Sequence, residues 1–376
     1  MIDELPDRAR FPRKGRGAVS NRTGRYERFT THAVDDGWRD VDGRVPDEEA
    51  PSKLVTGVQK DTSRTVIARN ESPDVGFDRS INPYRGCEHG CIYCYARPSH
   101  AYLGHSPGID FETKLYGKFD AVERLKAELA APGYTPRPIM ISGITDPYQP
   151  VERQLRITRS IIEVLVAHRH PFTMISKNGL MARDVDILGE AAKLGLVSAA
   201  LSITTLDTDL ARKMEPRAST PAKRLAAMKT LSDAGVPMAV MMAPIVPGLT
   251  DSEIESLLEA ARDAGAASAG FVMLRLPLEI KEIFAEWLTE HVHDRAKHVL
   301  TLMREVRGGK LYNSEWFSRQ RGTGAYAEMI EGRFRLAAKK LGLDRKREAL
   351  RCDLFTPPVV PPKPSKKEDP RQFSLL

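Results

Sequence analysis

Short apolar runs alternate with amphipathic stretches between about residues 76 and 292 of the 376-residue chain. Short apolar runs predict buried strands, and stretches with a helical repeat predict helices. The pattern predicts six strands, at residues 78–84, 138–145, 172–177, 197–204, 238–245 and 269–276. A helix is expected after each strand, at residues 119–131, 153–167, 183–194, 221–234, 252–264 and 279–292. This alternation is typical of a parallel sheet covered by helices.

Six strand-helix units are fewer than the eight of a closed TIM barrel, so the sequence predicts an α/β fold that forms an incomplete (β/α)6 TIM-type barrel. In such barrels the functional site lies where the strands end. Two further helical patterns, at residues 295–306 and 326–341, are expected to close one edge or to cover the mouth. Local signals mark two helix starts: Thr220 precedes a proline as a helix cap, and Thr250 with Glu253 forms a capping box.

Polar composition marks both ends of the chain. Residues 1–60 are rich in Arg, Asp and Gly and are expected to form a largely disordered basic leader. Residues 356–376 are rich in Pro and Lys and are expected to be a disordered tail. Between them we expect the partial barrel at residues 70–292 and a helical extension at residues 293–355.

The bulk composition limits the class of protein. Hydrophobic residues make up 41% of the chain, which suits a folded body of one large domain or two ordinary ones. We find no apolar run of about 18 residues for a membrane span and no apolar stretch of a signal peptide, so a cytoplasmic location without membrane association is expected. The net charge of +7 makes nucleic acid a candidate partner.

Three of the four cysteines follow directly after the first predicted strand. In the segment NPYRGCEHGCIYCYAR, Cys87, Cys91 and Cys94 have a C-x3-C-x2-C spacing. Such a cluster is poor material for disulfides and suits a metal site in a reducing compartment. Clusters of four irons normally take four thiolates, so three cysteines leave one iron open to a small molecule.

A structural zinc site is the alternative for these cysteines. It would take His89, His100, His105 or Cys352 as the fourth ligand. Zinc cysteines usually come as two separated pairs, whereas this triplet is continuous. The spacing therefore favours an iron–sulfur cluster.

The cysteine spacing, with the aromatic Tyr93 immediately before the third cysteine, resembles the cluster motif of the radical S-adenosylmethionine (SAM) superfamily. ITDPYQPVE, SKNG and SITTLD, which follow or end the next three predicted strands, make residues 78–276 look like its spore photoproduct lyase-like subgroup. The resemblance implies a [4Fe-4S] cluster on Cys87, Cys91 and Cys94. It also implies that SAM binds the open iron and is cleaved to methionine and a 5'-deoxyadenosyl radical. A protein electron donor, such as a flavodoxin or a ferredoxin, is implied as well.

The resemblance further suggests which residues hold SAM. Thr145 and Asp146 lie in the turn that replaces the family's Gly-Gly-Glu turn, and they are the candidates for the methionine amino group. Lys177 matches the family's lysine that meets the methionine carboxylate, with Ser202 as the hydroxyl partner, and Tyr93 is expected near the adenine. Each polar residue has an ordinary alternative. Asp146 suits a turn, Lys177 an exposed strand end, and Ser202 a satisfied hydroxyl in the barrel.

The reaction beyond SAM cleavage stays open. Spore photoproduct lyase has a further cysteine as hydrogen donor, and alignment on Asp146 places Gly143 there, so repair by the lyase's own route is not expected. Two classes of function remain. One is a radical enzyme with an unidentified substrate, for which nucleic acid or a nucleotide is a candidate. The other is a non-catalytic iron–sulfur or zinc protein that binds nucleic acid.

Two downstream features bear on the substrate. Arg275, at the end of the sixth predicted strand, either meets an anionic substrate group or forms a salt bridge in the barrel wall. Residues 311–326 combine aromatic and basic side chains. They either stack a base and hold a phosphate, or form a lid packed by Trp316 and Phe317 with the arginines in solvent.

Overall fold

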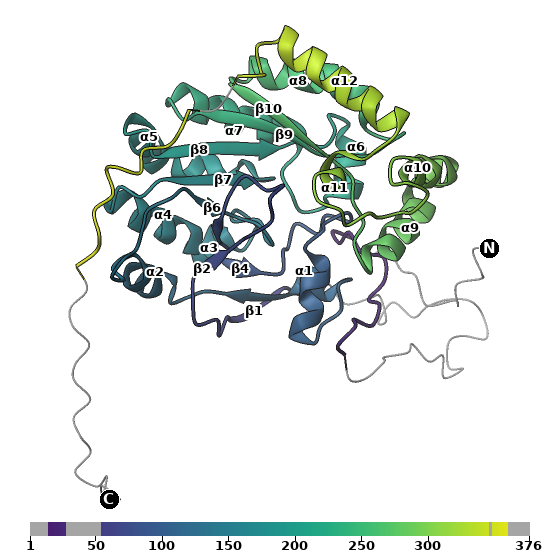
Figure 1. The fold of residues 1–376 in the computed structure, drawn as a ribbon. Helices are drawn as coiled ribbons and strands as arrows, with labels where there is room; N and C mark the ends of the chain where they lie inside the picture. Colours follow the sequence, from purple (N-terminus) through teal and green to yellow (C-terminus); the bar gives the residue numbers. More distant parts are fainter. Residues whose placement is uncertain (1–13, 28–53, 346–347, 360–376) are drawn as a thin grey trace, which may run out of the picture.

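The computed structural model describes residues 14–27, 54–345 and 348–359 (Figure 1). The parallel strands of its larger sheet are β3 (Arg79–Ile81), β6 (Ile139–Ile141), β7 (Phe172–Ser176), β8 (Val197–Ser202), β9 (Met238–Ile245) and β10 (Ser268–Met273). A short antiparallel strand, β2 (Ile67–Arg69), pairs with β3 at the edge. The order across the sheet is β10-β9-β8-β7-β6-β3-β2, and its two ends do not pair. The predicted six-stranded open barrel is therefore confirmed.

Helices cover the outside of this sheet. They are α2 (Ala121–Leu129), α3 (Glu152–Leu155), α4 (Ile157–Ala167), α5 (Val185–Lys193), α7 (Pro221–Asp233) and α8 (Ile254–Asp263). The helix after the last strand, α9 (Ile280–His291), packs instead with side chains of the cysteine loop. Along the layer α2 packs on α4, α4 on α5, α5 on α7, and α7 on α8. Each predicted helix is present, because one apolar face per helix is enough to place it against the rest of the fold.

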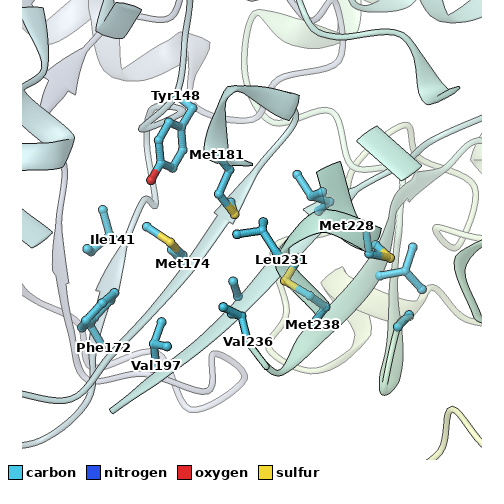
Figure 2. Close-up of a cluster of buried hydrophobic side chains, with 14 of the residues drawn as sticks. Ile141, Tyr148, Phe172, Met174, Met181, Val197, Met228, Leu231, Val236 and Met238 are labelled. Carbon is cyan, nitrogen blue, oxygen red and sulfur yellow. The ribbon is translucent and has the colours of Figure 1, made fainter. Parts of the chain in front are cut away.

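The core lies between the sheet and these helices. Figure 2 shows part of it, where side chains from β6, β7 and β8 meet those of α7 and β9. Phe172, Val197 and Leu231 have no exposed surface in this cluster, and Met174 and Met238 have 1%. Strands that are buried on both faces have nearly continuous apolar sequences, which is why these strands could be predicted from the sequence.

The carboxyl-terminal extension contains α10 (His293–Glu305), α11 (Ser318–Arg321) and α12 (Ala325–Lys340). The first packs on α9, α11 packs on β10, and α12 packs on α8. The two predicted helices of this region are thus confirmed, while the domain boundaries remain predictions. In the part of the chain that the structure describes, no helix is long and apolar enough to cross a membrane.

A second, small sheet has no counterpart in the predicted elements. Its strands are β1 (Gly57–Lys60), β5 (Lys114–Gly117) and β4 (Tyr84–Arg85), in the order β1-β5-β4. The strands β4 and β5 flank the cysteine loop, together with the short helix α1 (Asp110–Thr113). Another short helix, α6 (Thr208–Met214), follows β8 and was also not predicted.

One of the two predicted helix caps is wrong. The Thr220 side chain accepts a hydrogen bond from the third backbone N–H of α7, as predicted. The Thr250 hydroxyl instead accepts from the backbone N–H of Val246 at 2.9 Å. The Glu253 carboxylate accepts from the Thr205 hydroxyl at 2.5 Å, so both members of the expected capping box serve tertiary contacts.

The described parts of the predicted leader differ from the expectation of disorder. Residues 57–60 form β1, and residues 14–27 pack over the cysteine loop. The backbone N–H groups of Gly17 and Ala18 donate to the Glu112 carboxylate at 3.0 and 2.9 Å. The remaining leader residues, and residues 360–376 of the predicted tail, lie outside the described residues.

Candidate functional site

The three cysteines lie between β4 and α1, close to the carboxyl end of β3. Cys87 and Cys91 are buried, and Cys94 is half-buried. The loop is tied at its start by the Cys87 N–H, which donates to the Phe111 carbonyl at 3.0 Å. Gly90 has a φ of 69°, a backbone conformation that glycine adopts without strain.

Arg97 holds this loop from the inside, and its side chain is fully buried. Its guanidinium donates to the carbonyls of Cys91 and Gly90, both at 2.9 Å, and to the Glu112 carboxylate at 2.6 Å. Two further bonds go to the carbonyls of residues 107 and 108. All five N–H donors of Arg97 are thus used, so the backbone that carries the cysteines has one well-defined conformation.

Burial dominates the chemistry of the three thiols. It raises the pKa of Cys87, Cys91 and Cys94, and nearby carboxylates raise the pKa of Cys87 and Cys91 further. Thiolates must therefore be stabilised by iron, which couples proton release to metal binding. The donor set, three soft sulfurs in a site largely closed to water, fits an iron–sulfur cluster.

The zinc alternative gains no support from the geometry. Among the described residues, no three or more His, Cys, Asp or Glu side chains stand around a common point as ligands of one metal ion. Cys352 lies at the other end of the barrel, since the N–H of its neighbour Arg351 donates to Gly195 just before β8. In a four-iron cluster each thiolate binds a different iron, so the sulfurs do not need a common point.

Lys177 follows β7, and its ammonium group lies at the centre of a polar network. It donates to the Ser202 hydroxyl and to the Ala243 carbonyl, both at 2.8 Å. It also lies 3.2 Å from the Glu215 carboxylate and 5.3 Å from the centre of the Tyr93 ring. The structure therefore brings Lys177, Ser202 and Tyr93 together.

The sequence analysis did not single out Glu215, which begins the loop after α6. It is buried and accepts hydrogen bonds from the hydroxyls of Thr204, at 2.9 Å, and Tyr93, and from the Arg224 guanidinium. Burial alone would raise the pKa of Glu215, but the charges of Arg224 and Lys177 hold it well below its usual range. No signal in the segment KMEPR separates this buried acid from the many exposed ones.

Thr145 and Asp146 lie beside the cysteine loop, but their side chains bind the protein. The Asp146 carboxylate accepts from the Ser176 hydroxyl and the Lys177 backbone N–H, both at 2.7 Å. It also accepts from the backbone N–H two residues further on, which closes a turn. Thr145 donates to the Gly86 carbonyl at 2.7 Å. Both residues connect the turn after β6 to its neighbours, and their contact with a methionine amino group stays a prediction.

Comparison with known proteins identifies the family. The model of the radical SAM superfamily matches residues 81–261 of this chain. Residues 81–261 thus form a radical SAM domain. The matched residues include the three cysteines, Lys177 and Ser202, and such a domain implies a [4Fe-4S] cluster and SAM as cofactors.

The curated relatives have no stated activity. An uncharacterized protein of Mycobacterium tuberculosis is 36% identical over 226 residues, which cover 59% of this chain and 66% of the relative. An uncharacterized protein of Methanocaldococcus jannaschii is 28% identical over 173 residues, which cover 46% of this chain and 62% of the relative. The chain thus spans just under two thirds of the length of these relatives.

Solved structures agree on the fold. A mutant of spore photoproduct lyase has a TM-score of 0.54 at 15% identity, with 76% of this chain and 78% of that chain covered. The lyase complexed with a dinucleoside spore photoproduct has a TM-score of 0.52 over the same shares. At this low identity the likeness shows the radical SAM fold alone.

The turn after β6 distinguishes this radical SAM chain from the lyase. Gly143 has a φ of 145°, which side chains other than glycine rarely adopt. A Cβ atom added there would lie 3.3 Å from the Asn82 side-chain oxygen. The backbone at this position therefore disfavours the cysteine that the lyase carries.

The segment at residues 311–326 does not form the packed lid. Trp316 and Phe317 are 60% and 63% exposed. Arg319, expected in solvent, is the side chain that anchors the segment, through a bidentate ion pair with Asp74. The two aromatic side chains protrude from an anchored turn, and their stacking on a base stays a prediction.

Proposed function

We propose that the protein is an enzyme that cleaves SAM reductively and directs the resulting radical at a substrate. When bound on Cys87, Cys91 and Cys94, the [4Fe-4S] cluster supplies the electron that breaks the sulfonium bond, giving methionine and a 5'-deoxyadenosyl radical. The observation that carries the proposal is the buried three-cysteine loop beside the Lys177 network, in a chain with a radical SAM domain.

The chain's own residues suit the binding of SAM. Lys177 presents a compact positive charge that can hold the methionine carboxylate, and the Ser202 hydroxyl fixes the direction of its ammonium group. The Glu215 carboxylate pairs with the Lys177 ammonium group and accepts a hydrogen bond from the Tyr93 hydroxyl, so it fixes these two side chains relative to each other. Tyr93 is proposed beside the adenine. Thr145 and Asp146 are proposed at the methionine amino group, through the turn that they hold.

The substrate is proposed to be a nucleic acid or a nucleotide. The net charge of +7 suits an anionic partner, and the related fold of the lyase is known in complex with a dinucleoside photoproduct. A protein electron donor, such as a flavodoxin or a ferredoxin, is proposed as the reductant. We propose a reducing cytoplasm as the enzyme's location, because a three-cysteine cluster site needs reduced thiols.

Anaerobic reconstitution tests the proposal. The loaded protein should contain about four irons per chain, and it should release 5'-deoxyadenosine when SAM and a reductant are added. Cys91→Ala should abolish both, whereas Cys352→Ala, a matched change far from the loop, should preserve both. One zinc per chain with no nucleoside released would refute the proposal and favour the non-catalytic alternative.

The role of Lys177 has its own readout. Lys177→Met should leave the iron content unchanged and weaken SAM binding by roughly 10- to 100-fold, because a charge-assisted hydrogen bond is lost. Equilibrium binding of SAM to the loaded, unreduced protein measures this without turnover. Unchanged affinity would remove Lys177 from the binding site.

A further inference from the structure

Arg275 lies just after β10, at the mouth of the barrel, and its charge has no partner in the described chain. Its guanidinium stacks on the Tyr95 ring, with 4.3 Å between the central carbon and the ring centre. Tyr95 directly follows the last cysteine of the loop, and its hydroxyl donates to the Gly143 carbonyl. Neither a hydrogen bond nor an ion pair joins Arg275 to another described residue, so the predicted salt bridge in the barrel wall is absent. Glu279, an acid four residues on, pairs with Arg25 at 2.7 Å.

A second arginine charge nearby is also uncompensated. Arg307 is 2% exposed and donates only to backbone carbonyls, two at the end of β10 and two in residues 318–319. Its Nε atom is buried without a partner. The bonds to the carbonyls of residues 273 and 274 place Arg307 beside the backbone that leads into Arg275. Burial, and then the charge of Arg275, lowers the pKa of Arg307 to about 10.

Arg307 differs from two other deeply buried arginines among the described residues. Arg97 has the Glu112 carboxylate as its partner, and Arg224 has Glu215. A buried charge without a counter-ion is costly, and chains normally supply one. Arg307 is buried without a carboxylate partner, and the half-buried Arg275 near it has none among the described residues, which indicates that the counter-ion comes from outside the chain.

We propose that Arg275, backed by the charge of Arg307, is the binding site for a phosphate group of the substrate. Arg275 supplies the contact, since its planar N–H donors are free and match a phosphate. Arg307 contributes its positive charge without contacting the phosphate, because its Nη groups already donate to backbone carbonyls. A phosphate monoester carries close to two negative charges at neutral pH and so balances both arginines, whereas a carboxylate balances one. The assignment rests on the proposed function, since it makes the anion part of the substrate.

The strands place this site apart from the cofactor residues. Arg275 follows β10 at one end of the sheet, whereas Lys177 follows β7 in its middle. Lys177 is therefore the proposed cation for the SAM carboxylate, and Arg275 is left for the substrate. The exposed Trp316 and Phe317 precede α11, which packs on β10, so they flank the same end of the sheet.

Equilibrium dialysis of the iron-loaded protein against radiolabelled inorganic phosphate, without SAM or reductant, tests the site. One phosphate should bind per chain. Arg275→Gln should weaken binding at least roughly tenfold, as loss of a charge-assisted contact requires, and Arg275→Lys should weaken it less. Arg262→Gln is the matched control, because Arg262 is exposed on α8 and pairs only with neighbouring acids. Acetate should compete poorly, whereas thymidine monophosphate and glycerol 3-phosphate should compete well. The stronger competitor of the two identifies the source of the phosphate.

Three results would overturn the proposal. The first is equal phosphate affinity of Arg275→Gln and the unaltered protein, or no saturable binding up to roughly 10 mM. The second is loss of binding in Arg137→Gln instead, which would place the anion in the separate cavity of about 300 Å³ that Arg69, Arg79 and Arg137 line. The third is weakened SAM binding with unchanged phosphate binding. Release of 5'-deoxyadenosine is measured separately, so SAM cleavage can succeed where the phosphate site fails.

Discussion

Glu215 is the shared counter-ion of two cations, and its charge can be removed without changing its shape. Glu215→Gln keeps an acceptor for the Tyr93 hydroxyl but leaves Arg224 and Lys177 without a carboxylate. The side chains of Glu215 and Arg224 are 2% and 1% exposed, so solvent screens their interaction very little. Removing one partner of a buried ion pair costs about 3–5 kcal/mol, because the other charge stays buried. We therefore expect the free energy of unfolding to fall by about 3–5 kcal/mol.

Urea denaturation under anaerobic conditions measures this loss, with Glu331→Gln as the matched control. Glu331 also pairs with an arginine, at 2.6 Å, but the two side chains are 39% and 65% exposed. Exposed ion pairs contribute little, so the control should lose less than about 1 kcal/mol. The double variant Glu215→Gln with Arg224→Met should be more stable than Glu215→Gln alone, because it removes the stranded cation as well.

The pH dependence adds an independent check. The pKa of Glu215 is held below its ordinary value of 4.5, so its ionic stabilisation is fully present above pH 4.5 and is lost as the pH falls towards the folded-state pKa. The stability difference between the unaltered protein and Glu215→Gln should therefore narrow below pH 4.5. A loss no larger than that of Glu331→Gln at neutral pH would refute the reasoning.

Three further substitutions test the local geometry. Gly90→Ala should lower the free energy of unfolding and the iron content more than Gly133→Ala does. Both glycines have φ near 70°, so the backbone strain is similar. An added Cβ at Gly90 would lie 2.7 Å from the Glu112 carboxylate, whereas one at Gly133 meets nothing within 4 Å. Equal losses in urea denaturation would show that crowding plays no part. Phe317→Gly should leave the melting temperature unchanged or raise it. Phe317 has a φ of 64° and is 63% exposed, and relief of such backbone strain is worth about 1 kcal/mol or more. A clear drop in the melting temperature would mean that Phe317 packs against the fold. Burial lowers the pKa of His170 from 6.5 to about 4, so its contribution is complete above pH 6.5 and is lost as the pH falls towards 4. Between about pH 7.5 and 5.5 the unaltered protein should lose roughly 1.4 kcal/mol more than His170→Asn in urea denaturation, and equal losses would contradict the buried neutral state.

The strands and helices of the barrel were predictable because each buries a face that repeats along its own sequence. The small sheet was not, since β1 pairs with β5 more than fifty residues away and its burial pattern shows three exposed positions of four. Its order depends on long-range backbone pairing, which leaves no apolar period. The same holds for Gly17, whose close approach to Gly90 depends on tertiary packing rather than on local sequence.

The candidate site was predictable as a set of positions, but the role of each side chain depends on hydrogen bonds that only the fold supplies. Asp146 and Lys177 both stand at strand ends in the sequence. In the structure the protein supplies three N–H or O–H donors to the Asp146 carboxylate, which makes Asp146 an anchor for the turn. Arg275 occupies an equivalent position after β10, and its guanidinium stacks on the Tyr95 ring. The protein already satisfies the Asp146 carboxylate, whereas Arg275 makes no hydrogen bond or ion pair to another described residue, so Arg275 is better suited than Asp146 to meet a substrate.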